Sequence, residues 1–200
     1  MGYQDVAASE AVDVASWIAP RLHPFGQDVG SVIPTGFAAY AGITNDQREG
    51  ALSPAQGGEL VRVLEAHTST PRRCWLCLWN GYGYLHPGGT AWLTAADVPK
   101  KRKPPRFQIS FRRRSAPKDG RALVMLPHRE YLLFEGTVAE AAGWEDGPNL
   151  WWPDDRAWCV ASEIDLTTTY VGGSTELIGA LLDGVQLGAT RVSPDDTWPR

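Results

Sequence analysis

The sequence lacks the signatures that would place the chain in a membrane or assign it to a familiar enzyme class. No apolar run approaches the roughly 20 residues needed to cross a bilayer, and the opening residues, MGYQDVAASEAVDV, do not form a basic and then apolar leader. We therefore expect a cytoplasmic protein that does not enter a membrane. Walker, Rossmann, GxSxG and HExxH motifs are absent, so no motif indicates nucleotide binding, serine hydrolysis or zinc proteolysis.

Cysteine is also scarce, with three residues, an odd number that favours free cytosolic thiols over a disulfide framework. Cys74 and Cys77 lie between His67 and His86, which formally supplies four zinc ligands of acceptable type. The odd spacing of the two cysteines, however, places them on opposite faces of an expected strand. We predict buried free thiols here, with no metal and no cofactor.

The composition that remains is that of a globular chain. Its 200 residues are 43% hydrophobic and 21% charged, which fits one domain with a sizeable core. Nine tryptophans are unusual, because each brings a large apolar area and an N–H group that needs a partner when buried. We expect most of them in the core and some at aromatic surfaces.

Apolar periodicity predicts alternating helices and strands. Helices are expected over 6–19, 59–68, 138–142 and 174–185, and strands over 30–43, 73–79, 122–126, 131–136 and 157–166. Residues 73–79 are apolar on both faces, which is typical of a central strand, and the two strands that follow 120 read as a hairpin. We expect the tail from Gly188 to be loosely held. The order favours a single α+β domain over 1–200, with an antiparallel or mixed sheet and helices packed on one side.

The charge is unevenly distributed along the chain. Of the 19 basic residues, nine lie between Lys100 and Lys118, where no acidic residue occurs, and the other ten are set against 23 acidic residues. The 100–118 segment is predicted to be an insertion or flexible loop. With Phe107 and Phe111 among its cations, and with Arg112, Arg113 and Arg114 adjacent, it could also contact nucleic acid.

Carboxylates form a second candidate site. Glu163 and Asp165 share one face of the expected 157–166 strand, and Asp154 and Asp155 precede it. Paired carboxylates can bind a hard cation or divide acid and base roles, which suggests a small metal-dependent hydrolase that uses Glu163, Asp165 and Asp154. The structural alternative is that these are solvent-facing charges at a strand end.

Aromatic residues at turns form the third candidate. Trp79, Tyr82, Trp151 and Trp152 lie at expected turns or strand ends, and Asp154 and Arg156 could supply a charged rim for them. Tryptophan and tyrosine dominate the anchors of protein interfaces. The alternative is that Trp151 and Trp152 form a minor core beneath the loops.

Three stretches carry a resemblance to known proteins. They are RLHPFGQDVGSVIPTGFAAYAGI, HTSTPRRCWLCLWNGYG and PNLWWPDDRAWCVASEIDLTTTYVGGS, which together resemble an uncharacterised actinobacterial protein family. The resemblance does not extend to the 100–118 segment. At fold level the layered α+β body, the EIDL and YVGGS stretches and the leucine-rich final helix look like SUKH-type immunity proteins, which bind and neutralise toxins.

Three functional hypotheses follow from these patterns. The preferred one is a non-enzymatic protein-binding module, such as an immunity or regulatory partner protein, whose partner is another protein. The alternatives are the metal-dependent hydrolase and nucleic-acid binding through 100–118.

Overall fold

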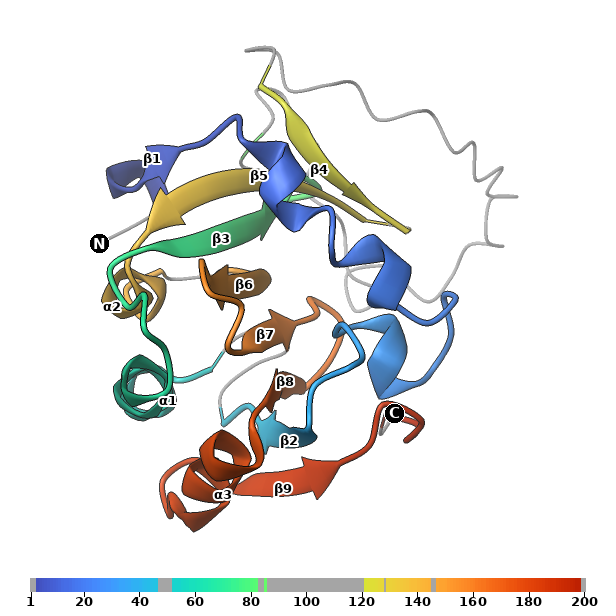
Figure 1. Cartoon of the computed structure of the whole chain (residues 1–200), viewed down its shortest axis with the longest axis vertical. Helices are drawn as coiled ribbons and strands as arrows, with labels where there is room; N and C mark the ends of the chain where they lie inside the picture. The colour runs from blue at the N-terminus through green and yellow to red at the C-terminus, as the bar shows by residue number, and fades with distance from the viewer. Residues whose placement is uncertain are drawn as a thin grey trace, which may run out of the picture.

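One antiparallel sheet organises the chain (Figure 1). The computed structural model describes residues 3–46, 52–82, 85, 121–127, 129–144 and 147–198. Within these residues the sheet has nine strands in the order β1-β5-β3-β6-β7-β8-β2-β9, and β4 also pairs with β5. This arrangement confirms the predicted α+β class, with a fully antiparallel sheet.

The strands of the described residues are short, and helices or longer segments separate many of them along the chain. Their bounds are β1 Ala7–Ala8, β2 Ala39–Thr44, β3 Cys74–Trp79, β4 Leu123–Leu126, β5 Arg129–Gly136, β6 Leu150–Pro153, β7 Cys159–Ser162, β8 Thr168–Gly173 and β9 Ala189–Val192. β4 and β5 form the predicted hairpin, in which Leu126 pairs with Arg129. The two-residue connection therefore fixes Arg129 at the start of β5.

The three α-helices found in the described residues lie on one face of the sheet (Figure 1). They are α1 Pro54–Ala66, α2 Val138–Ala141 and α3 Thr175–Asp183. Ser53 and Gln56 form a capping box at the start of α1, so the helix begins before Gly57 and Gly58 despite their low helix propensity. Trp158 ties α1 to the sheet, because its indole Nε1–H donates to the carbonyl of Leu64 at 3.1 Å.

The part of the chain before β2, which we call the N-terminal segment, covers the other face of the sheet. It does not form the helix expected over 6–19. Ala7 and Ala8 pair with the edge of β5 as β1, and the Ser9 N–H donates to the Leu133 carbonyl at 2.8 Å. Backbone groups that pair with the edge of β5 cannot also form the hydrogen bonds of an α-helix. After this pairing the chain continues through the short 3-10 helices Val12–Ala15, Ala19–Arg21 and Val29–Ser31. Its apolar residues, Trp17 and Ile18 among them, still enter the core.

The strand β3 has the position that its sequence predicts. It lies between β5 and β6, and its side chains alternate between the two cores. Cys74, Leu76 and Leu78 face the α-helices, whereas Trp75, Cys77 and Trp79 face the N-terminal segment. A strand that is apolar on both faces can occupy only the interior of a sheet that is covered on both sides.

Several strand bounds correct the sequence-based expectations. The strand expected over 30–43 begins only at Ala39, and the one expected over 157–166 ends at Ser162. β6 and β8 occupy stretches that were expected to be turn or loop. β9 pairs with β2, so at least 189–192 of the tail is held in the sheet.

The glycines of β8 explain why that strand resembles a loop in sequence. A Cβ atom added at Gly172 would lie 2.7 Å from the ring of Phe37 and 2.8 Å from that of Tyr40. Glycine is therefore needed where two aromatic rings pack directly onto the strand backbone. The residues before it, Thr168 to Val171, are β-branched or aromatic, as is typical of strands.

In the parts of the chain that the structure describes, no helix has both the length and the apolar character needed to cross a bilayer.

Candidate functional site

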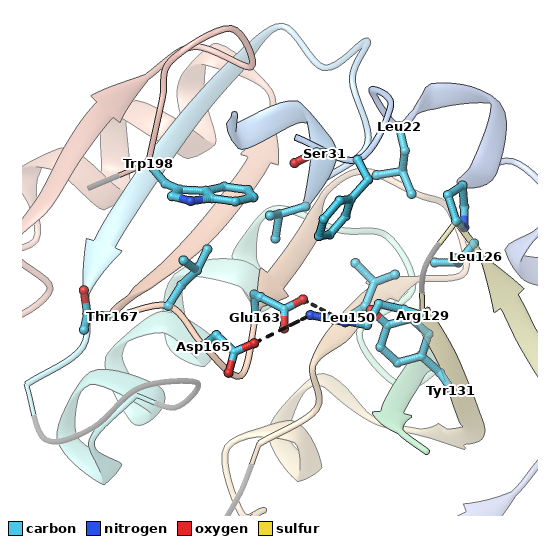
Figure 2. A pocket seen from close by; sticks show the side chains of 14 residues that line it. Leu22, Ser31, Leu126, Arg129, Tyr131, Leu150, Glu163, Asp165, Thr167 and Trp198 are labelled. Atoms are coloured by element: carbon cyan, nitrogen blue, oxygen red, sulfur yellow. Dashed lines mark hydrogen bonds and ion pairs between the residues drawn. The ribbon is translucent and has the colours of Figure 1, made fainter. Parts of the chain in front are cut away.

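A surface pocket lies on the sheet face that the N-terminal segment covers (Figure 2). Its volume is about 330 Å³. Its apolar lining includes Leu22, Phe25, Val32, Leu126, Leu150, Leu166 and Trp198, and its polar lining is Ser31, Arg129, Tyr131, Glu163, Asp165 and Thr167. We call it the Arg129 pocket. Its size falls in the range of pockets that take a small ligand or a side chain of a partner protein.

Arg129 and Glu163 form a two-pronged ion pair in this pocket. The Arg129 Nη2 lies 2.6 Å from Glu163 Oε1, and its Nε lies 3.0 Å from Oε2. The two side chains are 25% and 16% exposed. Glu163 and Asp165 lie in the turn that follows β7, and Asp165, which is 78% exposed, has its Oδ2 3.9 Å from the same Nη2. The two carboxylates are close together, as the sequence predicts. They lie on a turn and beside an arginine, however, and not on the face of a strand.

The electrostatics of the pocket keep its central groups in fixed protonation states. Burial opposes the charge of Arg129, but the hydrogen bonds and charge of Glu163 outweigh burial and raise the pKa of the guanidinium. Burial, with a smaller contribution from the charge of Glu163, raises the pKa of Tyr131 far above its ordinary value. Tyr131 is therefore a neutral phenol, and Arg129 a permanent cation, at any physiological pH.

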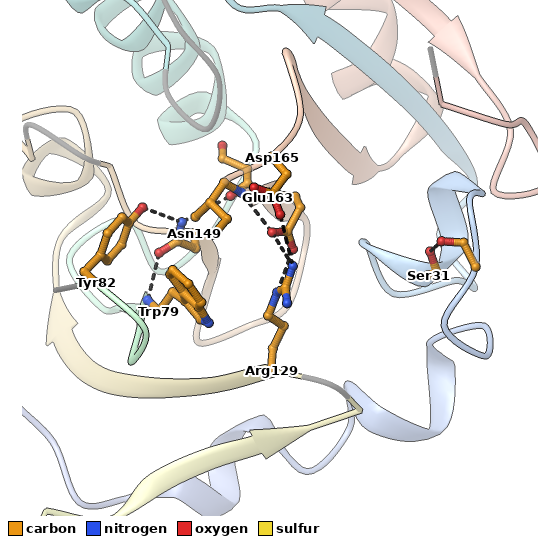
Figure 3. A network of polar contacts seen from close by, with 10 residues as sticks. Ser31, Trp79, Tyr82, Arg129, Asn149, Glu163 and Asp165 are labelled. Carbon is orange, nitrogen blue, oxygen red and sulfur yellow. Dashed lines mark hydrogen bonds and ion pairs between the residues drawn. The ribbon is translucent and has the colours of Figure 1, made fainter. Parts of the chain in front are cut away.

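The aromatic pair Trp79 and Tyr82 joins this site through Arg129 (Figure 3). The rings of Trp79 and Tyr82 meet edge to face with centroids 5.4 Å apart, and the Arg129 guanidinium carbon lies 5.7 Å from the Trp79 ring centroid. Asn149 connects the pair, because its Oδ1 accepts from the backbone N–H of Trp79 at 2.8 Å and its Nδ2 donates to the Tyr82 hydroxyl at 3.0 Å. Two candidate sites that are separate in sequence are thus adjacent in the structure.

Trp151 and Trp152 do not belong to this surface, and the prediction that they do is wrong. They are neighbours on β6, so their side chains enter the two opposite cores. Trp151 is 5% exposed and packs edge to face on Trp158, whereas Trp152 is fully buried against Trp17. Their large apolar areas stabilise the two main cores of the sheet, rather than a minor core beneath the loops.

Asp154 and Arg156 lie at the other end of β6, away from the Arg129 pocket. The Trp75 Nε1–H donates to Asp154 Oδ1 at 3.0 Å, and the Arg156 guanidinium carbon lies 5.6 Å from the Trp17 ring centroid. Leu150 lines the pocket, while Asp154 follows the last residue of the same strand. The expected charged rim therefore does not surround Trp79 and Tyr82. Nor does Asp154 join Glu163 and Asp165 in an acidic cluster.

The cysteines occupy separate environments, as their spacing predicts. Cys74 faces the α-helix side of the sheet and Cys77 the other side. Within the described ranges, no three histidine, cysteine or acidic side chains are close enough to hold a metal ion together. His86 lies outside the described residues, and so do Arg112, Arg113, Arg114 and the whole 100–118 segment. The nucleic-acid hypothesis stays a prediction.

Sequence reasoning missed Arg129, Asn149 and Phe25 as site residues. Arg129 appears in the sequence only as part of the 127–130 turn, and its partner Glu163 is 34 positions away. Asn149 is a buried amide whose role depends on pairings of three strands. Phe25 gave a weak signal, as an aromatic residue between Pro24 and Gly26, and its 63% exposure is unusual for so large an apolar side chain.

The chain has no significant match among protein-family models, curated proteins or solved structures.

Proposed function

We propose that this chain is a non-enzymatic binding module that recognises another protein through the Arg129 pocket. The observation that supports this most is the ion pair itself. Glu163, the more buried carboxylate of the site, accepts two hydrogen bonds from Arg129, so its oxygens are committed to a structural contact rather than to proton transfer. Asp165 remains as an exposed acceptor at the rim.

The pocket combines the features of a protein-interface anchor site. An apolar depression that includes the exposed ring of Phe25 and the indole of Trp198 can take an apolar side chain of a partner. The rim carries two carboxylates and one arginine, which favours a basic group beside that side chain. The partner surface that fits is therefore an apolar residue next to a lysine or arginine.

The role proposed within this class is an immunity or regulatory partner protein in the cytoplasm. The α+β architecture supports the immunity or regulatory role, and so does the resemblance of the EIDL and YVGGS stretches to SUKH-type immunity proteins. This support is an analogy at the level of fold. Free and buried Cys74, Cys77 and Cys159 support the cytoplasmic location, because reduced thiols are usual in that compartment.

The test is affinity capture from native lysate of the source cells, with quantitative mass spectrometry of what binds. Phe25→Ser removes the exposed ring, and Asp165→Lys reverses the rim charge. Val185→Ser is the matched control, because Val185 is 96% exposed and lies on the opposite side of the sheet, after α3. A partner should be captured by the unchanged chain and by Val185→Ser, and reduced at least tenfold with each pocket variant.

Two outcomes would contradict the proposal. One is that no protein is enriched by the unchanged chain over a blank support. The other is that every enriched protein binds the Phe25→Ser and Asp165→Lys variants as well as it binds the unchanged chain. Near-ultraviolet circular dichroism of each variant establishes that the fold is retained before capture is compared.

A further inference from the structure

A second pocket lies on the opposite face of the sheet, between α1 and α2. Its volume is about 540 Å³. Leu60 and Val61 line it from α1, Ala142 from the end of α2, and Trp144, Trp151 and Val160 from the loop and sheet beside them. We call it the α1–α2 pocket. It shares no lining residue with the Arg129 pocket, and it plays no part in the function proposed above.

The lining of the α1–α2 pocket determines the charge of what can bind there. None of the described residues that line it carries an ionisable side chain. A charged ligand would lose its hydration without gaining a counter-ion, which is costly in an apolar site. The pocket is therefore suited to an uncharged molecule, and the indoles of Trp144 and Trp151 favour an aromatic one.

Ser162 and Thr169 are polar residues of the lining, and their hydrogen bonds determine which of them donates and which accepts. The Asn45 Nδ2 donates to the Leu166 carbonyl, which leaves Asn45 Oδ1 to accept from the Thr169 hydroxyl at 3.0 Å. Thr169 has a single hydroxyl hydrogen, so in its 2.9 Å contact with Ser162 the serine must be the donor. Ser162, which is 7% exposed and lines the pocket, keeps only acceptor capacity for a ligand.

We propose that the α1–α2 pocket binds an uncharged aromatic molecule that carries one O–H or N–H donor. The aromatic body lies among Trp144, Trp151 and the apolar side chains of α1, and the donor hydrogen-bonds to Ser162 Oγ. The pocket volume is within the range that accommodates a molecule of two or more rings.

Three naphthalene probes that differ in one group test each part of this proposal by isothermal titration calorimetry. 2-Naphthol has the aromatic body and a donor, 2-methoxynaphthalene has no donor, and 2-naphthoate carries a charge. 2-Naphthol should bind, 2-methoxynaphthalene should bind about tenfold more weakly, as expected for one lost hydrogen bond, and 2-naphthoate should bind more weakly still. Ser162→Ala should abolish the difference between the first two probes.

A steric variant locates the binding site. Ala142 is exposed at the end of α2 and lines the pocket, so Ala142→Phe should fill it and abolish binding of 2-naphthol. Ala139→Phe is the matched control, because Ala139 is exposed on the same helix and does not line the pocket. Absence of 2-naphthol binding, binding that persists in Ala142→Phe, or equal affinity for all three probes would each overturn the proposal.

Discussion

Arg129 donates two hydrogen bonds to Glu163 across two intervening strands of the sheet. Arg129 opens β5 and Glu163 follows β7, and β3 and β6 lie between these strands in the sheet order. The ion pair thus ties the β4–β5 turn to the β7–β8 turn at one end of the sheet. Because both side chains are largely removed from water, this contact has more influence on stability than an exposed pair would have.

Replacing Glu163 with glutamine should destabilise the fold by about 1–3 kcal/mol. The substitution keeps the shape of the side chain but leaves the partly buried Arg129 with only the exposed Asp165, 3.9 Å away, as a counter-charge. Hydrogen bonds to charged groups contribute in this range. Urea unfolding followed by tryptophan fluorescence measures the change. Glu59→Gln is the control: it breaks the Arg62–Glu59 pair of α1, whose arginine is 69% exposed, and should have a much smaller effect. Equal effects would show that the Arg129–Glu163 pair has no special weight.

Trp152→Ala should destabilise the protein by about 3–5 kcal/mol, as expected for removal of a fully buried aromatic side chain. The indole packs edge to face on Trp17, with ring centroids 5.9 Å apart, and a packed core relaxes only in part into the space that it would leave. Guanidinium chloride unfolding measures the loss. A change below about 1 kcal/mol would contradict the assignment of Trp152 to the core and restore the hypothesis of a surface role.

The three cysteine thiols should not react with a disulfide reagent in the native protein. Cys74, Cys77 and Cys159 are buried and free, and burial raises the pKa of each thiol well above its ordinary value. At pH 8 the reagent should therefore modify none of them until denaturant is added, when all three react. Fast modification of any thiol without denaturant would mean that the sheet opens locally at that strand.

The elements that could be predicted from the sequence are those whose signals are local. β3 shows apolar residues on both faces, α3 has Ser174 at its N-cap, and the β4–β5 hairpin has a short turn between two apolar runs. β8 escaped prediction because Gly172 makes room for side chains that are distant in sequence. Residues 6–19 have helical spacing, but the free edge of β5 competes for their backbone groups.

The candidate site was predictable only where its residues are close together in the sequence. Glu163 and Asp165 are close in sequence, so their proximity could be inferred, and Trp79 and Tyr82 are three positions apart. The contacts that unite these pairs come from Arg129, at the start of β5, and from Asn149, which precedes β6. No local pattern reports such contacts, because they depend on the order of strands in the sheet.

Asp155 illustrates how a candidate acidic residue can instead hold two loops together. Its carboxylate accepts hydrogen bonds from the Ser69 N–H and the Ser69 hydroxyl, each at 2.7 Å, from the Thr68 hydroxyl at 2.8 Å, and from the Ala157 N–H at 3.1 Å. Partial burial works against the charge, but these donors outweigh it and lower the pKa of Asp155 below its ordinary value of 3.8. The contact joins the loop after α1 to the turn between β6 and β7.

Asp155→Asn should therefore destabilise the protein in a pH-dependent way. Because the folded-state pKa lies below the unfolded-state value, the carboxylate contributes stability above about pH 3.8, and this contribution is lost as the pH falls through the folded-state pKa. At pH 7 the variant should be less stable by about 1 kcal/mol, since solvent screens an exposed contact. The difference from the unchanged chain should shrink steadily below pH 4.

Thermal unfolding between pH 3 and pH 7 measures this difference in stability. Asp195→Asn is the control, because Asp195 is exposed and its carboxylate makes no hydrogen bond to the described residues. A difference that stays constant over this range would show that the charge of Asp155 is not what holds the two loops.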